Sequence, residues 1–431
     1  MHSRWILRSF VLAAALMLTL PVVASAQTSR VEGMALQGDY IKDYTGIYTY
    51  PSCLPIVGNL VYAELGNNLF DPATGHPITQ DRSLGVVMDK LFDGKLGVWG
   101  IHLRQETPQM GQGDAFSHTG AGFGQDPNSN TNESFDLMWG KKAGGTSIGL
   151  RLNRSFSKFE GTIPGATTTL EFDFPGAAFN GTPNLARNIL GFGAGVGFEL
   201  NSNSSMELSV LYQTRTYENT TAPPTTGTQD DGGATYMFAA RMFWGWQPNV
   251  MVVPVFKWYS FDLSEKTVGG VPTTFDNSLK GWQLGVAGNW TLGTNDLLVL
   301  GVTFAQNKIE EEEDLFGLSA AAGMSPQINA TETLMPQVFG ALETHVNHWL
   351  TLRVGANKGA FQKIKLEDQG APNATQTFSF SSFNMNIGAG VKLGTIQLDA
   401  ILSNDFPQNM GWIGSGIAKP YFPKVTATYA F

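Results

Sequence analysis

The last eight residues, Lys424-Val-Thr-Ala-Thr-Tyr-Ala-Phe431, alternate strictly between two kinds of side chain. Val425, Ala427, Tyr429 and Phe431 share one face of an extended strand, whereas lysine and threonine fill the other face. The first face suits lipid and the second suits water. A strand with two such faces is typical of a transmembrane β-barrel, in which the apolar side chains point outward.

The same period of two recurs along most of the chain. Between 383 and 393, apolar residues alternate with asparagine, glycine and lysine, and Gln397 and Asp399 interrupt the apolar residues of the next segment in the same way. The segments lie near Asn59 to Leu65, Leu84, Leu96, Phe135, Ser147, Ile189, Met206, Tyr236, Met251, Trp282, Leu298, Val338, Leu350, Phe383, Ile396 and Val425. The sequence therefore predicts an all-β fold, an antiparallel transmembrane β-barrel of about 16 strands, with a range of roughly 14 to 18.

The connections between these segments alternate between short and long. The short ones lie near 93–94, 144–145, 201–204, 247–249, 294–295, 347–348 and 394–395. The long ones, rich in Gly, Pro, Asn and Thr, span 67–82, 106–131, 160–187, 219–233, 263–277, 310–331, 365–376 and 406–420. This layout predicts short periplasmic turns and long extracellular loops. Trp244, Trp246, Trp290 and Trp349 lie close to short turns, as a periplasmic aromatic girdle would require.

The N-terminus has the pattern of an export signal. Arg4 and Arg8 precede an apolar run from Phe10 to Val23, and small residues follow at 24–26. A permanent membrane helix is the weaker interpretation, because such a helix needs about 20 apolar residues. We therefore expect residues 1–26 to be a cleaved signal peptide, residues 27–58 to form an N-terminal periplasmic or plug segment, and residues 59–431 to form the barrel.

Composition excludes several classes of function. The formal net charge of −9 includes Arg4 and Arg8, and their removal would leave −11, which argues against nucleic acid as a partner. The only cysteine, Cys53, cannot form an intramolecular disulfide. No motif for a metal, a cofactor or catalysis stands out, because His345 and His348 would fall on opposite faces of a strand. We therefore expect no cofactor and no enzymatic activity.

Alternation predicts which charged side chains face the lumen, where water or opposite charges can satisfy them. They are Arg104, Asp136, Arg151, Glu199, Glu207, Arg241, Lys257, Glu343, Arg353, Lys392 and Asp399. Their mixed signs indicate no ion preference, and they leave a salt-bridged, plugged interior open as an alternative. Every second residue from Gly191 to Gly197 is glycine, which predicts a small lumen face with space for a plug, a loop or a passage.

Two resemblances add to this interpretation. Val425, Ala427, Tyr429 and Phe431 resemble the C-terminal signature of Gram-negative, porin-like outer-membrane proteins, which implies recognition by the barrel-assembly machinery. Residues 38–66, with Asp43-Tyr44, Ile47-Tyr48 and Tyr50-Pro51-Ser52, resemble the N-terminal stretch of the long-chain fatty-acid transporter family. Members of that family usually carry Asn-Pro-Ala where this chain has Tyr50-Pro51-Ser52.

Together these patterns predict a channel or facilitator in the bacterial outer membrane for passive uptake of small solutes, since about 16 strands leave an aqueous interior. A plugged transporter for hydrophobic compounds and a structural or adhesive barrel are the alternatives. The expected partners are outer-membrane lipids, lipopolysaccharide and the barrel-assembly machinery. The solute and the oligomeric state stay open.

Overall fold

The computed structural model describes residues 28–66, 69–70, 77–79, 82–89, 91–104, 133–160, 163–169, 178–222, 226–269, 273–293, 295–312, 325, 327–370, 374–381, 383–403 and 424–431. The expected signal peptide, residues 1–26, lies outside this part of the chain and stays a prediction. Among the described residues, no helix is long and apolar enough to cross a membrane.

Sixteen antiparallel strands form a closed barrel, as expected from the sequence. They are β1 (Leu60–Gly66), β4 (Arg82–Met88), β5 (Val98–Arg104), β6 (Glu133–Ala143), β7 (Thr146–Glu160), β9 (Ala178–Asn201), β10 (Ser204–Ala222), β12 (Ala234–Gln247), β13 (Val250–Asp262), β16 (Ser278–Leu292), β17 (Asp296–Glu311), β18 (Ile328–His345), β19 (Leu350–Gly359), β22 (Phe383–Leu393), β23 (Ile396–Ser403) and β24 (Lys424–Ala430). Pairing of β1 with β24, from Leu60 opposite Ala430 to Gly66 opposite Lys424, closes the barrel.

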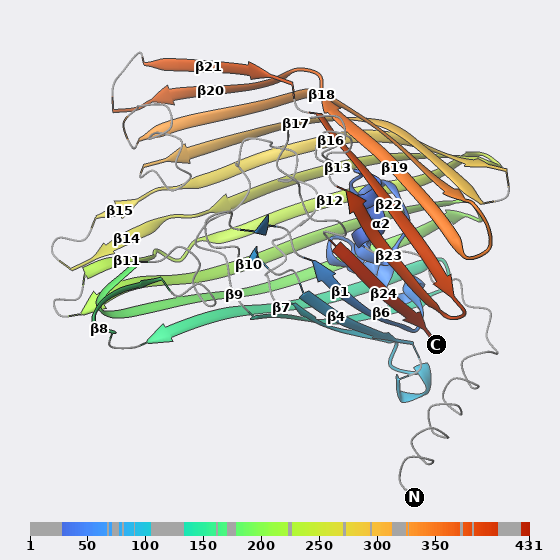
Figure 1. Ribbon diagram of the computed structural model, residues 1–431, viewed down its shortest axis with the longest axis horizontal. Helices are drawn as coiled ribbons and strands as arrows, with labels where there is room; N and C mark the ends of the chain where they lie inside the picture. Colours follow the sequence, from blue (N-terminus) through green and yellow to red (C-terminus); the bar gives the residue numbers. More distant parts are fainter. Residues whose placement is uncertain are drawn as a thin grey trace, which may run out of the picture.

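The barrel wall is much taller on one side than on the other (Figure 1). Strand β9 has 24 residues and β10 has 19, whereas β1, β4, β5 and β24 have 7 each. The strands β8 (Ile163–Thr169), β11 (Thr226–Asp230), β14 (Glu265–Val268), β15 (Thr274–Phe275), β20 (Gln362–Asp368) and β21 (Thr375–Phe380) add to the high side. We call the part of the sheet that continues beyond the ends of the short strands the tall wall.

The tall wall corrects the predicted loop boundaries. Parts of the stretches 160–187, 219–233, 263–277, 310–331 and 365–376, which we expected to be loops, are strands. Away from lipid the outer face no longer has to be apolar, so residues such as Thr214, Thr216 and Glu218 of β10 carry no hydrophobic alternation. The backbone nevertheless continues the ladder, because β9 and β10 pair as far as Thr182 and Ala222.

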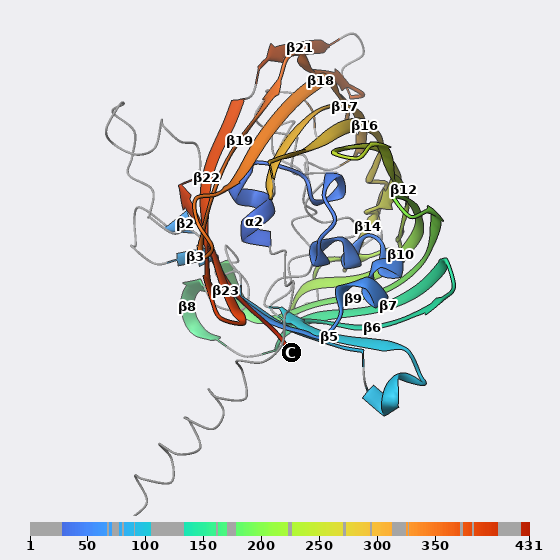
Figure 2. The same ribbon diagram turned by 90° about the vertical axis from the view of Figure 1, so that its right-hand side faces the viewer.

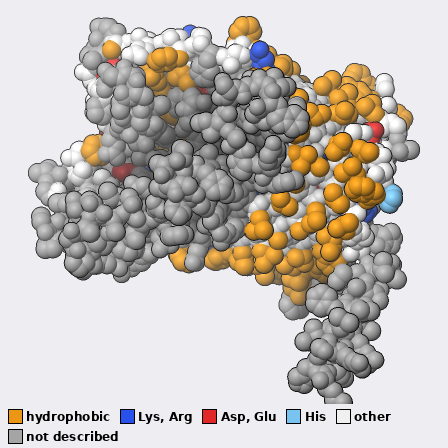
Figure 3. Space-filling model, viewed as in Figure 1, with side chains coloured by type: hydrophobic (Ala, Val, Ile, Leu, Met, Phe, Trp, Pro, Cys, Tyr) orange, Lys and Arg blue, Asp and Glu red, His pale blue; other side chains and the backbone are white. Residues whose placement is uncertain are grey.

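The outer surface of the barrel is apolar around the short-strand end. Exposed apolar side chains there include Leu103, Leu150, Phe192, Val210, Leu284, Leu300 and Leu352. Figure 3 shows hydrophobic side chains gathered on the right-hand part of the molecule. On β24, Lys424, Thr426 and Thr428 are buried toward the interior, whereas the intervening residues face outward. This is the arrangement that a lipid-facing barrel requires.

The N-terminal segment lies inside the barrel (Figure 2). It consists of α2 (Thr28–Gly33), η1 (Gly38–Tyr40), η2 (Tyr44–Tyr48), η3 (Pro51–Cys53) and α3 (Leu54–Val57). Helix α2 packs on β22 and β23, and η3 packs on β7 and β9, so the segment reaches both sides of the wall. We call residues 28–58 the plug. The remaining described elements are η4 (Leu91–Gly94) and a small separate sheet of β2 (Leu69–Phe70) and β3 (Pro77–Thr79).

Two paired glycines let the plug backbone approach the wall. Gly149 of β7 lies opposite Gly195 of β9, and both face η3. A Cβ at Gly195 would lie 3.1 Å from the Ser52 amide nitrogen, and a Cβ at Gly149 would overlap the Pro51 carbonyl. The glycine-rich face that the sequence shows on β9 is therefore where the plug is closest to the wall.

We expect Gly149→Val to destabilise the folded barrel by about 1–3 kcal/mol, because the branched side chain would collide with the Pro51 backbone. Urea unfolding in detergent, followed by tryptophan fluorescence, measures this. The control is Gly145→Ala, whose Cβ would meet the Glu199 carbonyl at an ordinary 3.5 Å. Equal unfolding midpoints for the two variants would contradict the close approach.

Candidate functional site between the plug and the barrel wall

A chain of four alternating charges ties α2 to the wall. Arg30 donates to both carboxylate oxygens of Glu343, from Nε at 2.8 Å and from Nη2 at 2.7 Å. Glu343 Oε2 also accepts from Arg353 Nε at 2.6 Å, and Arg353 in turn pairs with Asp399. All four side chains are buried, and bidentate contacts of this kind are among the strongest in proteins.

A second buried charge, Arg241 of β12, contacts the middle of the plug. Its Nε lies 2.5 Å from Glu207 Oε2, and its Nη1 donates to the Asp39 carbonyl at 3.2 Å. The guanidinium also lies 4.2 Å from the centre of the Tyr50 ring, and its Nη2 lies 3.2 Å from Cys53 Sγ. One wall residue thus holds two separate turns of the plug, η1 and η3.

Two further ion pairs complete this set. Arg151 Nε lies 2.7 Å from Asp136 Oδ1, and its Nη1 donates to the Tyr48 carbonyl at 2.8 Å. Lys257 Nζ lies 2.5 Å from Asp39 Oδ2. Burial of these charges is tolerable because each has an opposite charge and, for Arg151, a carbonyl acceptor as well.

Neutral amide side chains of the wall also donate hydrogen bonds to the plug backbone. An irregular segment has carbonyl groups that no helix or sheet satisfies, and such groups are costly when buried. The wall donates to them from Asn289 to the Tyr40 carbonyl (2.7 Å) and from Asn357 to the Ala35 carbonyl (3.0 Å). Asn386 adds a second donor to the Glu32 carbonyl (2.7 Å), which also accepts from the Ala35 amide. The inner face of the barrel is therefore matched to the backbone of this plug.

The structure brings most of the predicted lumen-facing charges into these contacts. Eight are buried beside the plug: Asp136, Arg151, Glu207, Arg241, Lys257, Glu343, Arg353 and Asp399. Glu199 and Lys392 lie exposed near the short turns, and Glu199 pairs with Lys142 at 2.5 Å. The side chain of Arg104 lies outside the described residues. Sequence reasoning missed Arg30 and Asp39, since the irregular plug has no period that tells which way a side chain points.

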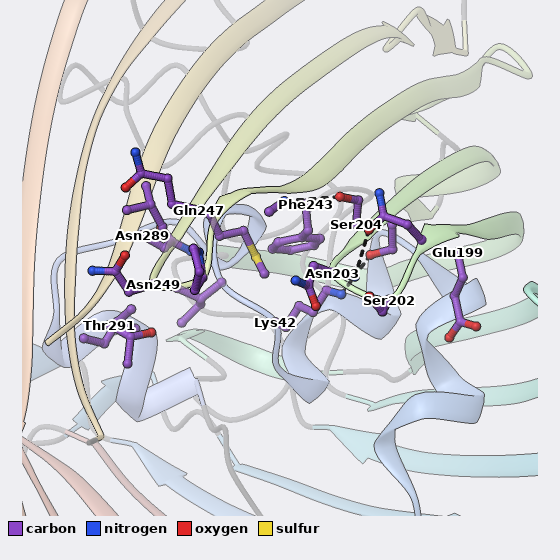
Figure 4. A pocket seen from close by; sticks show the side chains of 18 of the residues that line it. Lys42, Glu199, Ser202, Asn203, Ser204, Phe243, Gln247, Asn249, Asn289 and Thr291 are labelled. Atoms are coloured by element: carbon purple, nitrogen blue, oxygen red, sulfur yellow. Dashed lines mark hydrogen bonds between the residues drawn. The ribbon is translucent and has the colours of Figure 1, made fainter. Parts of the chain in front are cut away.

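Two cavities adjoin where the plug meets the wall at the short-turn end. The larger, about 810 Å³, is lined mainly by amide and hydroxyl side chains of the turns (Figure 4). The smaller, about 370 Å³, lies between the plug and the β1–β24 seam and reaches Phe431. Lys42 and Ile56 line both cavities, so these two plug side chains stand at their junction.

Lys42 spans the junction from the plug to the wall. Its Nζ lies 2.8 Å from Ser205 Oγ and 4.8 Å from the centre of the Phe243 ring. Partial burial lowers the pKa of Lys42 from its usual range. Among the described residues no carboxylate lies within ion-pair distance of Lys42, so a hydroxyl and an aromatic face hold this cation.

The inner face of the tall wall carries a set of apolar side chains that is continuous with the plug and is interspersed with buried polar residues. Its buried side chains include Tyr259, Phe261, Leu279, Ile309, Ile328, Ile364 and Leu366. They belong to one hydrophobic cluster with Tyr44, Ile47, Tyr48, Tyr50 and Leu54 of the plug. An apolar surface therefore runs along the inside of the barrel from the tall wall to the plug.

Cys53 lies in this cluster and has the character of a buried structural residue. Burial raises the pKa of its thiol, and nearby Glu207 acts in the same direction. A thiol held in its protonated form is a poor nucleophile.

Glu343→Gln should destabilise the barrel by about 3–5 kcal/mol, because it leaves Arg30 and Arg353 without their shared counter-charge in a buried site. The urea midpoint in detergent provides the measurement. Glu199→Gln removes an exposed partner of Lys142 and serves as the matched control, with little expected effect. If the two variants unfold alike, the charge chain does not hold the plug.

Comparisons with known proteins add the following. No family model matches the chain, and no curated protein matches it. Similar solved structures include the Pseudomonas putida toluene transporter TodX (8% identity, TM-score 0.39, 93% of this chain and 95% of that one) and a Pseudomonas aeruginosa FadL homologue (9%, 0.41, 96% and 99%). Another is the monoaromatic hydrocarbon channel CymD (9%, 0.37, 94% and 97%). Likenesses this distant carry no argument about function, which has to rest on the plug and its surroundings.

Proposed function

We propose that this chain is an outer-membrane transporter for hydrophobic compounds, with the plug across its path. The observation that carries the proposal is the cluster of apolar side chains on the inner face of the tall wall, which is continuous with the apolar core of the plug. A hydrophobic compound that moves along such a surface stays out of water. A lipid-facing exterior and the C-terminal aromatic signature support the outer membrane as its location.

The two adjoining cavities supply the remaining part of the route. They lie between the plug and the short turns, on the side that faces the periplasm in this orientation. A compound that passes the plug would enter the smaller cavity, cross at Lys42 and leave through the larger one. The amide and hydroxyl lining of the larger cavity suits release toward water.

A facilitator for passive uptake of small polar solutes is the second candidate. The larger cavity favours it, because many amide and hydroxyl side chains line it and it would admit a sugar-sized molecule. Buried ion pairs and plug backbone occupy the interior above that cavity, which disfavours a continuous water-filled passage. The two candidates therefore differ in the polarity of what they carry.

Uptake of N-phenylnaphthylamine, an uncharged hydrophobic fluorophore, by intact cells with a lipopolysaccharide outer leaflet tests the proposal. Cells that carry the chain should take it up faster than cells without it. Ile364→Asn should slow uptake, because it places a polar group within the apolar cluster, whereas Lys365→Asn on the opposite face should not. Liposomes that swell in isotonic monosaccharide, without any effect on the fluorophore, would favour the passive channel instead.

Lys42→Trp should slow uptake of the same fluorophore several-fold, because the indole would fill the junction of the two cavities. The control is Lys141→Trp, which places the same side chain on an exposed position near the same rim. Both variants should keep the unfolding midpoint of the parent. Unchanged uptake in Lys42→Trp would remove this junction from the route.

A further inference from the structure

Four polar side chains form a connected cluster on the inner face of the tall wall. Tyr259 donates to Asn307 Oδ1, and Asn307 Nδ2 donates to Glu332 Oε2 at 3.0 Å. Gln362 Nε2 donates to Glu332 Oε1 at 2.8 Å. The four residues come from β13, β17, β18 and β20, and all are buried.

Glycine at 281 makes the cluster possible. Gly281 of β16 lies between Tyr259 and Asn307 in the ladder, opposite both. A Cβ there would lie 2.5 Å from Asn307 Oδ1 and 2.5 Å from the Tyr259 ring. Without a side chain at 281, the tyrosine reaches across one strand to its partner.

Glu332 differs from the carboxylates of the plug contacts, such as Glu343 and Glu207, because those carboxylates are paired with arginines. Glu332 is 2% exposed, and its side-chain hydrogen bonds in the described chain come from two neutral amides, with no basic group in ion-pair range. Gln362, 1% exposed, leaves its Oε1 with no hydrogen-bond partner among the described residues. The cluster thus has a carboxyl group without a counter-charge and acceptor capacity to spare.

Stability does not account for such a group. A buried carboxylate without a counter-charge costs free energy, and apolar residues of similar size in its place are often neutral or stabilising. Its neighbours Ile364 and Leu366 are apolar, so beyond the two amide hydrogen bonds these surroundings offer no counter-charge. What the cluster lacks is a positively charged or hydrogen-bond-donating group from elsewhere.

We propose that Glu332 and Gln362 bind the amino group of a hydrophobic amine, so that the compounds carried are apolar molecules with a cationic end. This inference rests on the proposed function and specifies its substrate class. The ammonium group would donate to the Glu332 carboxylate and to Gln362 Oε1, while the apolar remainder would contact Ile364 and Leu366. Burial strengthens this attraction, because little water screens it.

The test uses the purified full chain in detergent with two fluorescent probes. Dansylcadaverine has a free primary amine, and its N-acetyl derivative has the same apolar body without the charge. Fluorescence polarisation should show that the parent binds the amine about tenfold more tightly than the acetylated probe, as a charge-assisted hydrogen bond would provide. Glu332→Gln should abolish this preference and leave the affinity for the acetylated probe unchanged.

Glu310→Gln is the matched control. Glu310 lies on the neighbouring strand β17 and pairs with Lys308 at 2.5 Å on the exposed face, so its loss should leave the preference intact. If Glu332→Gln does not fold, as judged by its heat-modified mobility on a gel, Gln362→Met provides the same test through the second acceptor. A folded variant at either position that keeps the full preference overturns the proposal.

The outcomes separate the two proposals. A parent that carries N-phenylnaphthylamine into cells but binds both dansyl probes equally keeps the transport proposal and overturns the amine site. A parent that carries no hydrophobic fluorophore and shows no preference overturns both.

Discussion

Buried charge pairs between plug and wall are the contacts on which the rest of the molecule depends. Arg30, Glu343, Arg353 and Asp399 form one row of alternating charges, and Arg241 joins Glu207 to two turns of the plug. Each charge is out of water, so removal of the plug would separate Arg30 from Glu343 and Asp39 from Lys257, and it would take several plug carbonyls from their donors on the wall. Opening of the barrel by release of the whole plug therefore costs much free energy. A local shift beside Lys42 disturbs one hydrogen bond to Ser205.

Much of the barrel was predictable because lipid imposes a simple rule. Where the outer face must be apolar and the inner face polar or small, a period of two appears, and all sixteen strands could be located from it. This rule does not apply to the parts of the strands that do not face lipid. The outer end of β10, from Asn219 to Ala222, pairs as well as the rest of the strand but has no apolar alternation in its sequence, so it was assigned to a loop.

The candidate site was predictable only from the wall side. Alternation pointed to Asp136, Arg241 and Glu343 as inward-facing, because a strand fixes the direction of its side chains. It could not pair them with Arg30 or Asp39, which lie in an irregular segment whose direction depends on tertiary packing. Glu332 was missed for a related reason, since it lies directly after the stretch 310–331 that was expected to be a loop and before the segment located near Val338. The small inner face that the sequence predicted from Gly191 to Gly197 includes Gly195, which lies with Gly149 where the plug backbone fits against the wall.

The plug contacts strands from early and late parts of the chain, and this determines the order in which the molecule can assemble. Helix α2 packs on β22 and β23, and its Glu32 pairs with Lys424 of β24, so its docking surface is complete only when the whole chain is present. η3 packs on β7 and β9, which come much earlier in the chain. The middle of the plug can therefore dock first, and the α2 end must wait until the seam between residues 60–66 and 424–430 closes around it. Docking of the plug and closure of the barrel are therefore completed in the same step of folding.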